Sequence, residues 1–211
     1  MRTDDLIRAL AADANRPVRP IRRWLVGALL AGTALSIALF CLVLRPRPDI
    51  GDALHSSAFL LKALVVLCLA ATAATAVIEA ALPTAPRRGR KVLWVAPAVL
   101  VVMLIAELIS VPASAWPARW IGHNAVHCLT LIPILSAAPA IGLLIAMKHG
   151  APSSPTRAGA IAGLMAGAIG ACLYAITCPD DSPLFIASWY TLAIVATTAA
   201  CAAAGHRILR W

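Results

Sequence analysis

Charged residues are scarce in this sequence: Asp, Glu, Lys and Arg together make up 13% of its 211 residues, whereas 61% are hydrophobic. Ordinary soluble domains are about half apolar and about a quarter charged. A soluble core of this size cannot bury so much apolar surface, so lipid must cover much of the chain. The composition excludes an ordinary soluble protein and leaves no soluble face on which the net charge of +9 would bind nucleic acid directly.

Signatures of catalysis are also missing. The sequence has no Cys-x-x-Cys pair, no glycine-rich phosphate-binding loop and no His-Glu-x-x-His motif. No nucleophile stands in a recognisable pattern with a general base. We therefore expect neither an enzyme nor a bound cofactor.

Six apolar segments each have about the 20 residues that a helix needs to cross the hydrocarbon core of a bilayer. Backbone polar groups inside lipid must be satisfied within their own segment, so all six are predicted to be helices. Pro133 and Pro139 interrupt the fourth segment and are expected to kink it. The sequence predicts an all-α, polytopic membrane protein whose six spans are residues 24–44, 58–82, 92–112, 126–147, 158–177 and 184–204.

Lysine and arginine are unevenly distributed over the connections between these segments. With the N-terminus placed in the cytoplasm, 14 of the 18 cations lie on the cytoplasmic side and 4 on the outer side. By the positive-inside rule, we expect an inner-membrane protein with both ends of the chain in the cytoplasm. Residues 1–23 form a cytoplasmic segment, and residues 24–211 form the transmembrane domain.

The N-terminal segment is predicted to begin with a short helix. Thr3 is its expected N-cap, Asp4 and Asp5 suit the first turn, and Leu6 and Leu10 contribute to one apolar stripe. Such a helix can lie on the membrane surface, although its acidic residues suit an anionic leaflet poorly. It can equally be offered to the groove of a soluble partner. The residues alone leave both interpretations open.

Two features inside the predicted spans concern packing and charge. Gly159, Gly163 and Gly167 recur at four-residue spacing in the fifth span, which favours close approach of a neighbouring helix.

Lys62 and Glu107 are costly charges near the outer ends of the second and third spans, so we expect them to form an intramembrane ion pair. The alternative is an ion path, in which case the protein would be a small ion-coupled transporter.

Cysteines and histidines gather towards the outer side. Cys128 opens the fourth span and Cys178 starts the last outer loop, so an oxidising compartment would permit a disulfide between them. His123 and His127 share a helix face and, together with the two cysteines, form a candidate soft-metal cluster of no standard spacing. A membrane thiol-disulfide oxidoreductase is a further alternative. Cys68, Cys172 and Cys201 are attributed to packing.

Three stretches resemble the NrsF-type anti-sigma factors of proteobacteria. They are residues 2–13 (RTDDLIRALAAD), residues 178–190 (CPDDSPLFIASWY) and residues 205–211 (GHRILRW). The six-span layout extends the resemblance over the whole chain. The resemblance implies that the cytoplasmic N-terminal segment holds an extracytoplasmic-function sigma factor at the membrane and releases it under oxidative or heavy-metal stress.

The resemblance also assigns roles to particular residues. It implies that Thr3, Asp4, Asp5, Leu6 and Leu10 bind the sigma factor, the acids facing a basic surface and the leucines serving as apolar contacts. It further implies a sensor built from a pair of outer-side cysteines. The matching positions in this sequence are Cys128 and Cys178.

Overall fold

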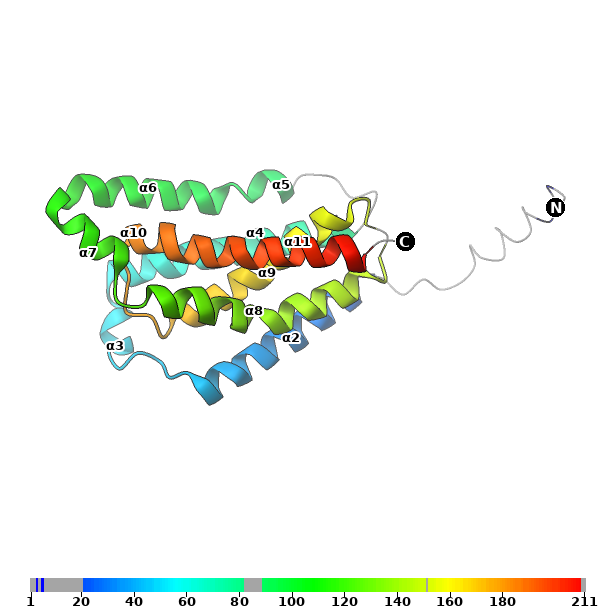
Figure 1. Ribbon diagram of the computed structural model, residues 1–211, viewed down its shortest axis with the longest axis horizontal. Coiled ribbons are helices and arrows are strands. Elements are labelled where there is room, and N and C mark those ends of the chain that lie inside the picture. Colours follow the sequence, from blue (N-terminus) through cyan, green and yellow to red (C-terminus); the bar gives the residue numbers. More distant parts are fainter. Residues whose placement is uncertain (1–2, 4, 6–20, 82–88, 151, 210–211) are drawn as a thin grey trace.

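A computed structural model describes residues 3, 5, 21–81, 89–150 and 152–209 of the chain. Helices are the only regular elements in these ranges, which agrees with the predicted all-α class. Figure 1 shows that the long helices run roughly alongside one another in a single bundle. The six long helices are α2 (Ile21–Val43), α4 (Ser57–Ala81), α6 (Val95–Ser110), α8 (Ala125–Met147), α9 (Pro155–Ala175) and α11 (Thr191–Ile208).

Short helical elements lie in the connections. The last long helix is preceded by two of them, of which the second is a single π-helical stretch that continues directly into α11. The short elements are α3 (Ile50–Ala53), α5 (Gly89–Val92), η1 (Ala113–Ala115), α7 (Trp116–Ile121), α10 (Pro183–Phe185) and η2 (Ile186–Tyr190).

Each of the six predicted spans coincides with one of the long helices. Within the described ranges, five helices are long and apolar enough to cross a membrane by themselves, the last of them running as Pro183–Ile208. The third predicted span, residues 92–112, is shorter in the structure: α6 has 16 residues, and the chain then bends by 118° into Ala113–Ile121. By helix length and composition the chain is therefore a multi-pass membrane protein, with five candidate spans among the described residues, or six if the bent pair is one of them.

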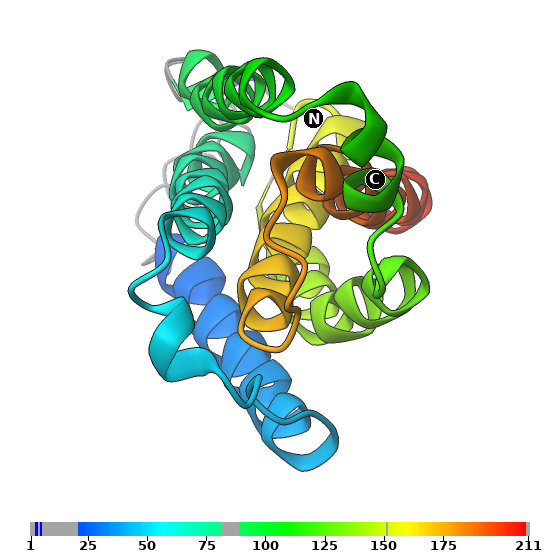
Figure 2. The ribbon, with the colours of Figure 1, turned by 90° about the vertical axis from the view of Figure 1, so that its left-hand side faces the viewer.

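Helix α9 lies at the centre of the bundle, against α4, α8 and α11 (Figure 2). Its glycines allow α11 to approach closely: a Cβ placed on Gly163 would lie 2.6 Å from the Cβ of Cys201, and one on Gly167 would lie 3.2 Å from Ile194. A Cβ on Gly159 would meet the backbone of Cys201 and Gly205. The packing role predicted for the three glycines is thus confirmed.

Helix α8 continues through both of its prolines, and α2 compensates for the second one. Pro139 has no N–H to donate to the carbonyl of Leu135 one turn earlier. The buried hydroxyl of Ser36 donates to that carbonyl at 2.6 Å. One turn before Ser36, Gly32 lies so close that an added Cβ would sit 2.5 Å from the Cα of Pro139. The missing helical bond is therefore replaced by an interhelical one, as irregular backbone in a membrane requires.

The two ends of the bundle differ in charge. We call the end where α2 and α9 begin and α8 and α11 end the basic end, because the described side chains there include Arg22, Arg23, Lys91, Lys148, Arg157 and Arg207. The opposite end, which we call the loop end, contains α3, α7, α10 and the connection between α9 and α10. The acidic side chains described below gather at the loop end.

Candidate functional site

The connection of residues 176–182 between α9 and α10 lies at the loop end and contacts most of the surrounding elements. Its sequence supplies two consecutive acids, Asp180 and Asp181, directly after Cys178 and Pro179. Buried or partly buried carboxylates need partners of opposite charge or hydrogen-bond donors. Three sets of such contacts, described next, fix this connection to four other parts of the chain.

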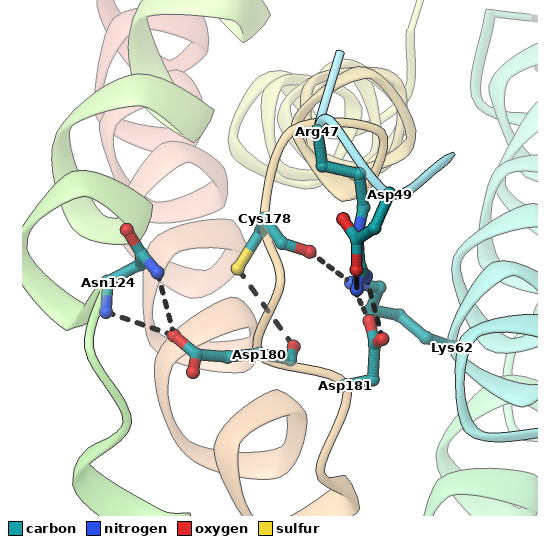
Figure 3. Close-up of polar contacts among 7 residues, drawn as sticks. All are labelled: Arg47, Asp49, Lys62, Asn124, Cys178, Asp180 and Asp181. Carbon is teal, nitrogen blue, oxygen red and sulfur yellow. Dashed lines mark hydrogen bonds and ion pairs between the residues drawn. The ribbon is translucent and has the colours of Figure 1, made fainter. Parts of the chain in front are cut away.

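The first set joins the connection to α4 and to the loop after α2 (Figure 3). Lys62 of α4 is fully buried and forms an ion pair with Asp181. Its Nζ also donates to the carbonyl oxygen of Cys178 at 2.8 Å. Arg47 Nη1 donates to the other oxygen of the Asp181 carboxylate, also at 2.8 Å. The carboxylate of Asp181 is thus held between two cations from different elements.

Arg47 makes a second ion pair that faces water. Its guanidinium donates twice to Asp49, at 2.7 and 2.8 Å. This hydrogen bonding lowers the pKa of Asp49 to about 2 and raises the pKa of Arg47. The guanidinium of Arg47 and the ammonium of Lys62 both lie near the ring of Phe59, at 5.9 and 5.4 Å from its centre. The two cations are therefore flanked by carboxylates and by an aromatic face.

The second set joins the connection to the start of α8. Asp180 Oδ2 accepts hydrogen bonds from the backbone N–H of His123 at 3.1 Å and of Asn124 at 3.0 Å, and from the Asn124 side chain at 3.0 Å. Free N–H groups at a helix start are often satisfied by a carboxylate, which also suits the helix dipole. Here the carboxylate comes from a distant part of the chain. Asp180 thereby ties the segment of Cys178 to the helix that carries Cys128.

Gly122 allows the chain to turn from α7 into α8 at this point. Its φ of +57° is in the left-handed region, which side chains with a Cβ seldom adopt. A Cβ at this position would also lie 2.6 Å from the ring of Phe185 and 3.0 Å from the carboxyl carbon of Asp180. A glycine is therefore required both by the backbone and by the close packing of the connection.

The third set joins the connection to α6, which is joined in turn to α7. Glu107 of α6 accepts from the Ser182 hydroxyl at 2.8 Å and from the backbone N–H of Leu184 at 2.8 Å. Arg119 of α7 donates to the same carboxylate at 2.9 Å. The predicted ion pair between Lys62 and Glu107 is therefore not formed: each residue has a different partner. Both charges are thus neutralised by local partners at one end of the bundle, which does not favour the ion-path alternative.

We refer to Arg47, Lys62, Glu107, Arg119, Asp180 and Asp181 as the polar cluster. Of its members, the sequence indicated only Lys62 and Glu107. The sequence does contain a signal for the cluster: two consecutive acids, Asp180 and Asp181, stand in a short loop on the side of the membrane that has few cations to pair with them. Four of the 18 cations fall at this end, and three of them pair with carboxylates here.

Cys128 and Cys178 lie beside the polar cluster. Both are fully buried free thiols and belong to one apolar cluster with Tyr174, Tyr190 and Phe185. The structure therefore brings the two predicted sensor residues into the same part of the core. Burial raises the pKa of the Cys178 thiol, although the nearby Lys62 acts in the opposite direction. A thiol-disulfide oxidoreductase needs a thiol with a lowered pKa, so this environment disfavours that alternative.

The predicted metal cluster is not present. His123 is 94% exposed and His127 is exposed, whereas Cys128 and Cys178 are buried. Within residues 21–81, 89–150 and 152–209, no three His, Cys, Asp or Glu side chains are grouped so as to hold a metal ion. The expected common helix face is not formed, because His123 precedes the first turn of α8, and both histidine side chains are exposed.

The predicted N-terminal contact residues are described only in part. Thr3 and Asp5 are exposed. Asp4, Leu6 and Leu10 lie outside the described residues. Among the remaining cysteines, Cys41 is exposed, Cys68 and Cys172 are half-buried, and Cys201 is buried.

Comparison of the sequence with known proteins identifies the family of this chain. Residues 10–211 match the family model described as NrsF, negative regulator of sigma F. Over the full length of both chains, the sequence is 34% identical to the "Probable anti-sigma-F factor NrsF" of Azospira oryzae and 35% identical to the "Anti-sigma-F factor NrsF" of Caulobacter vibrioides. No solved structure gives a significant match. The chain thus belongs to the NrsF family of membrane-bound negative regulators, which are not enzymes.

Proposed function

We propose that this protein is an anti-sigma factor that holds an extracytoplasmic-function sigma factor at the inner membrane and releases it under oxidative or heavy-metal stress. The observation that carries the proposal is the match over the full length of both chains to a relative named an anti-sigma-F factor. A sigma factor bound at the membrane cannot join RNA polymerase. Release therefore switches on the genes that the sigma factor reads.

In this proposal the sigma factor binds residues 1–23, through Thr3, Asp4, Asp5, Leu6 and Leu10. The basic end of the bundle faces the cytoplasm by the positive-inside rule, and α2, which follows this segment in the sequence, begins at that end. The exposed carboxylate of Asp5 is free to meet a basic surface, and electrostatic complementarity of this kind favours selective association. The topology and the binding segment are both parts of the proposal.

The experiment is co-purification of the sigma factor with the tagged, full-length protein from membranes. Asp5→Asn and Leu6→Ala should each reduce the recovered sigma factor and raise transcription of the regulated genes. Asp52→Asn is the matched control, because it removes an exposed carboxylate from the loop end. Recovery of no sigma factor with the unaltered protein, or equal losses with Asp5→Asn and Asp52→Asn, would contradict the proposal.

The proposed sensor is the pair Cys128 and Cys178. Both side chains are almost inaccessible, so a metal ion bound to the thiolates or an oxygen added to a sulfur has no room without a shift of the surrounding groups. The connection that carries Cys178 is the one fixed by Lys62, Asp180 and Asp181. A change at the thiols would therefore strain contacts that reach α4, α6 and α8. Such a local change can bias two arrangements of the helices.

Induction of a reporter gene by cadmium or by a thiol oxidant tests the sensor. Cys128→Ser and Cys178→Ser should each abolish induction, whereas the exposed Cys41→Ser should leave it intact. Constitutive binding of the sigma factor, measured by co-purification without stress, should be kept by all three variants. Normal induction in the Cys128→Ser and Cys178→Ser proteins would rule out the thiols as the sensor without affecting the sigma-binding proposal.

A further inference from the structure

A groove of about 720 Å³ opens between α2 and α8 at the basic end. Its walls are small or apolar side chains, and Arg23 and Trp24 stand at its end. Arg23, Gly27 and Ala31 recur every four residues along one face of α2, so the groove extends about 12 Å along the helix. A Cβ added to Gly27 would meet nothing within 4 Å, which leaves this wall open.

The residues at the mouth of the groove suit a phospholipid headgroup. Arg23 is exposed, and its guanidinium forms no hydrogen bond or ion pair with the described residues. Trp24 stacks on His149 of the α8 side, with ring centres 4.8 Å apart and planes 3° apart. Tryptophan is the residue that collects at the level of the lipid headgroups. The mouth therefore combines a free cation with a ring at the interface.

The charge of the whole basic end points to the sign of the ligand. Six cationic side chains are described at this end, namely Arg22, Arg23, Lys91, Lys148, Arg157 and Arg207, against one carboxylate, Glu79. A second copy of the chain docked symmetrically on this groove would bring Arg22 and Arg23 of both copies together, and like charges oppose that contact. An anionic lipid meets the same surface favourably.

We propose that this groove is a binding site for one anionic phospholipid, with an acyl chain along Gly27 and Ala31 and the phosphate on Arg23. The headgroup contact and the groove are separate requirements, since Arg23 supplies charge and the small residues supply room. The site is independent of the sigma-factor and cysteine proposals.

Tryptophan quenching in vesicles tests the proposal with the full-length protein. The protein is reconstituted in vesicles of ordinary phosphatidylcholine. One series contains rising fractions of brominated phosphatidylglycerol, and the other contains rising fractions of brominated phosphatidylcholine. The Trp24 signal is the difference between the unaltered protein and Trp24→Phe. We expect the brominated anionic lipid to reach half-maximal quenching of Trp24 at a fraction about fivefold lower than brominated phosphatidylcholine does. A factor of this size corresponds to the contribution of about one cation to lipid binding.

A matched pair of arginine variants and one glycine variant separate the two requirements. Arg23→Gln should remove the preference for the anionic lipid, whereas Arg22→Gln, which removes the same charge from a residue outside the groove, should keep it. Gly27→Leu should fill the groove and reduce Trp24 quenching by both lipids. Equal quenching by the two lipids, identical behaviour of the two arginine variants, or unchanged quenching in Gly27→Leu would each overturn the proposal. Protection of Trp24 that grows with protein density would identify a second copy as the occupant instead.

Discussion

Lys62 and Cys178, 116 positions apart in the sequence, are joined by a hydrogen bond of 2.8 Å from the buried ammonium to the backbone carbonyl. The same ammonium pairs with Asp181 three residues later. Because the carboxylate is also bound by Arg47, the two sides of the ion pair are not equivalent. Loss of the acid leaves the buried ammonium of Lys62 without a counter-charge, whereas loss of the lysine leaves the acid with Arg47.

This asymmetry gives the first prediction. Asp181→Asn should lower the free energy of unfolding by about 3–5 kcal/mol, since an uncompensated buried charge is costly. Lys62→Met should cost less, about 1–3 kcal/mol, which is the usual loss for an acceptor left unsatisfied. Thermal or denaturant unfolding in detergent micelles measures both. A larger loss in Lys62→Met than in Asp181→Asn would contradict the assigned pairing.

A second prediction concerns the replacement of a helical bond by Ser36. Ser36→Ala should cost about 1–3 kcal/mol, because the buried Leu135 carbonyl then has no donor. In a Pro139→Ala background, residue 139 regains its N–H and can donate to that carbonyl itself. The cost of Ser36→Ala should therefore shrink in that background, which a double-mutant cycle of unfolding free energies measures. Additive effects would show that the two positions are not coupled.

The third prediction rests on the positive φ of Gly122. Gly122→Ala should cost about 1–2 kcal/mol from backbone conformation, and more because the new Cβ would collide with Phe185. Gly51→Ala in α3 is the control, since a Cβ there would meet nothing within 4 Å. The melting temperatures of the two variants should differ clearly. A stable Gly122→Ala protein would mean that the turn into α8 is built differently.

Acid should weaken the exposed pair of Arg47 and Asp49 only at very low pH. The pKa of Asp49 is lowered to about 2 by Arg47, against about 3.9 in an unfolded chain. A lowered native pKa means that the pair contributes stability above about pH 3.9 and that this contribution is lost as the pH falls through about 2. The difference in melting temperature between the unaltered protein and Asp49→Asn should thus be constant at neutral and mildly acidic pH and disappear near pH 2. Asp52→Asn controls for the loss of one exposed carboxylate, and a difference that disappears near neutral pH would contradict the lowered pKa.

The helices of this fold follow from the sequence because lipid imposes one simple requirement. Each span needs a long apolar run with its backbone bonds closed internally, so residues 126–147 and 158–177 are recognisable without knowledge of their neighbours. The four-residue spacing of Gly159, Gly163 and Gly167 likewise predicts a packed face, although it does not say that α11 is the partner.

The contacts of the loop end do not follow in this way. The sequence predicts a pair of Lys62 and Glu107 because the two residues lie at similar depths in the membrane. Depth alone does not determine which side chains face one another. Their partners, Asp181 and Arg119, come from connections that have no periodicity to reveal their direction. His123 and His127 show the same limit, because their four-residue spacing does not say where α8 begins or that Cys178 is buried.

The shortness of α6 has a consequence for the surrounding bilayer. Its 16 residues rise about 24 Å, whereas the hydrocarbon core is about 30 Å thick. If α6 crosses the bilayer as part of the bent pair, the lipids beside it must thin or the helix must sink towards one leaflet, and either adjustment costs energy that grows with membrane thickness. Since Glu107 lies in the last turn of α6, this hydrophobic mismatch would strain the hydrogen bond between Glu107 and Ser182.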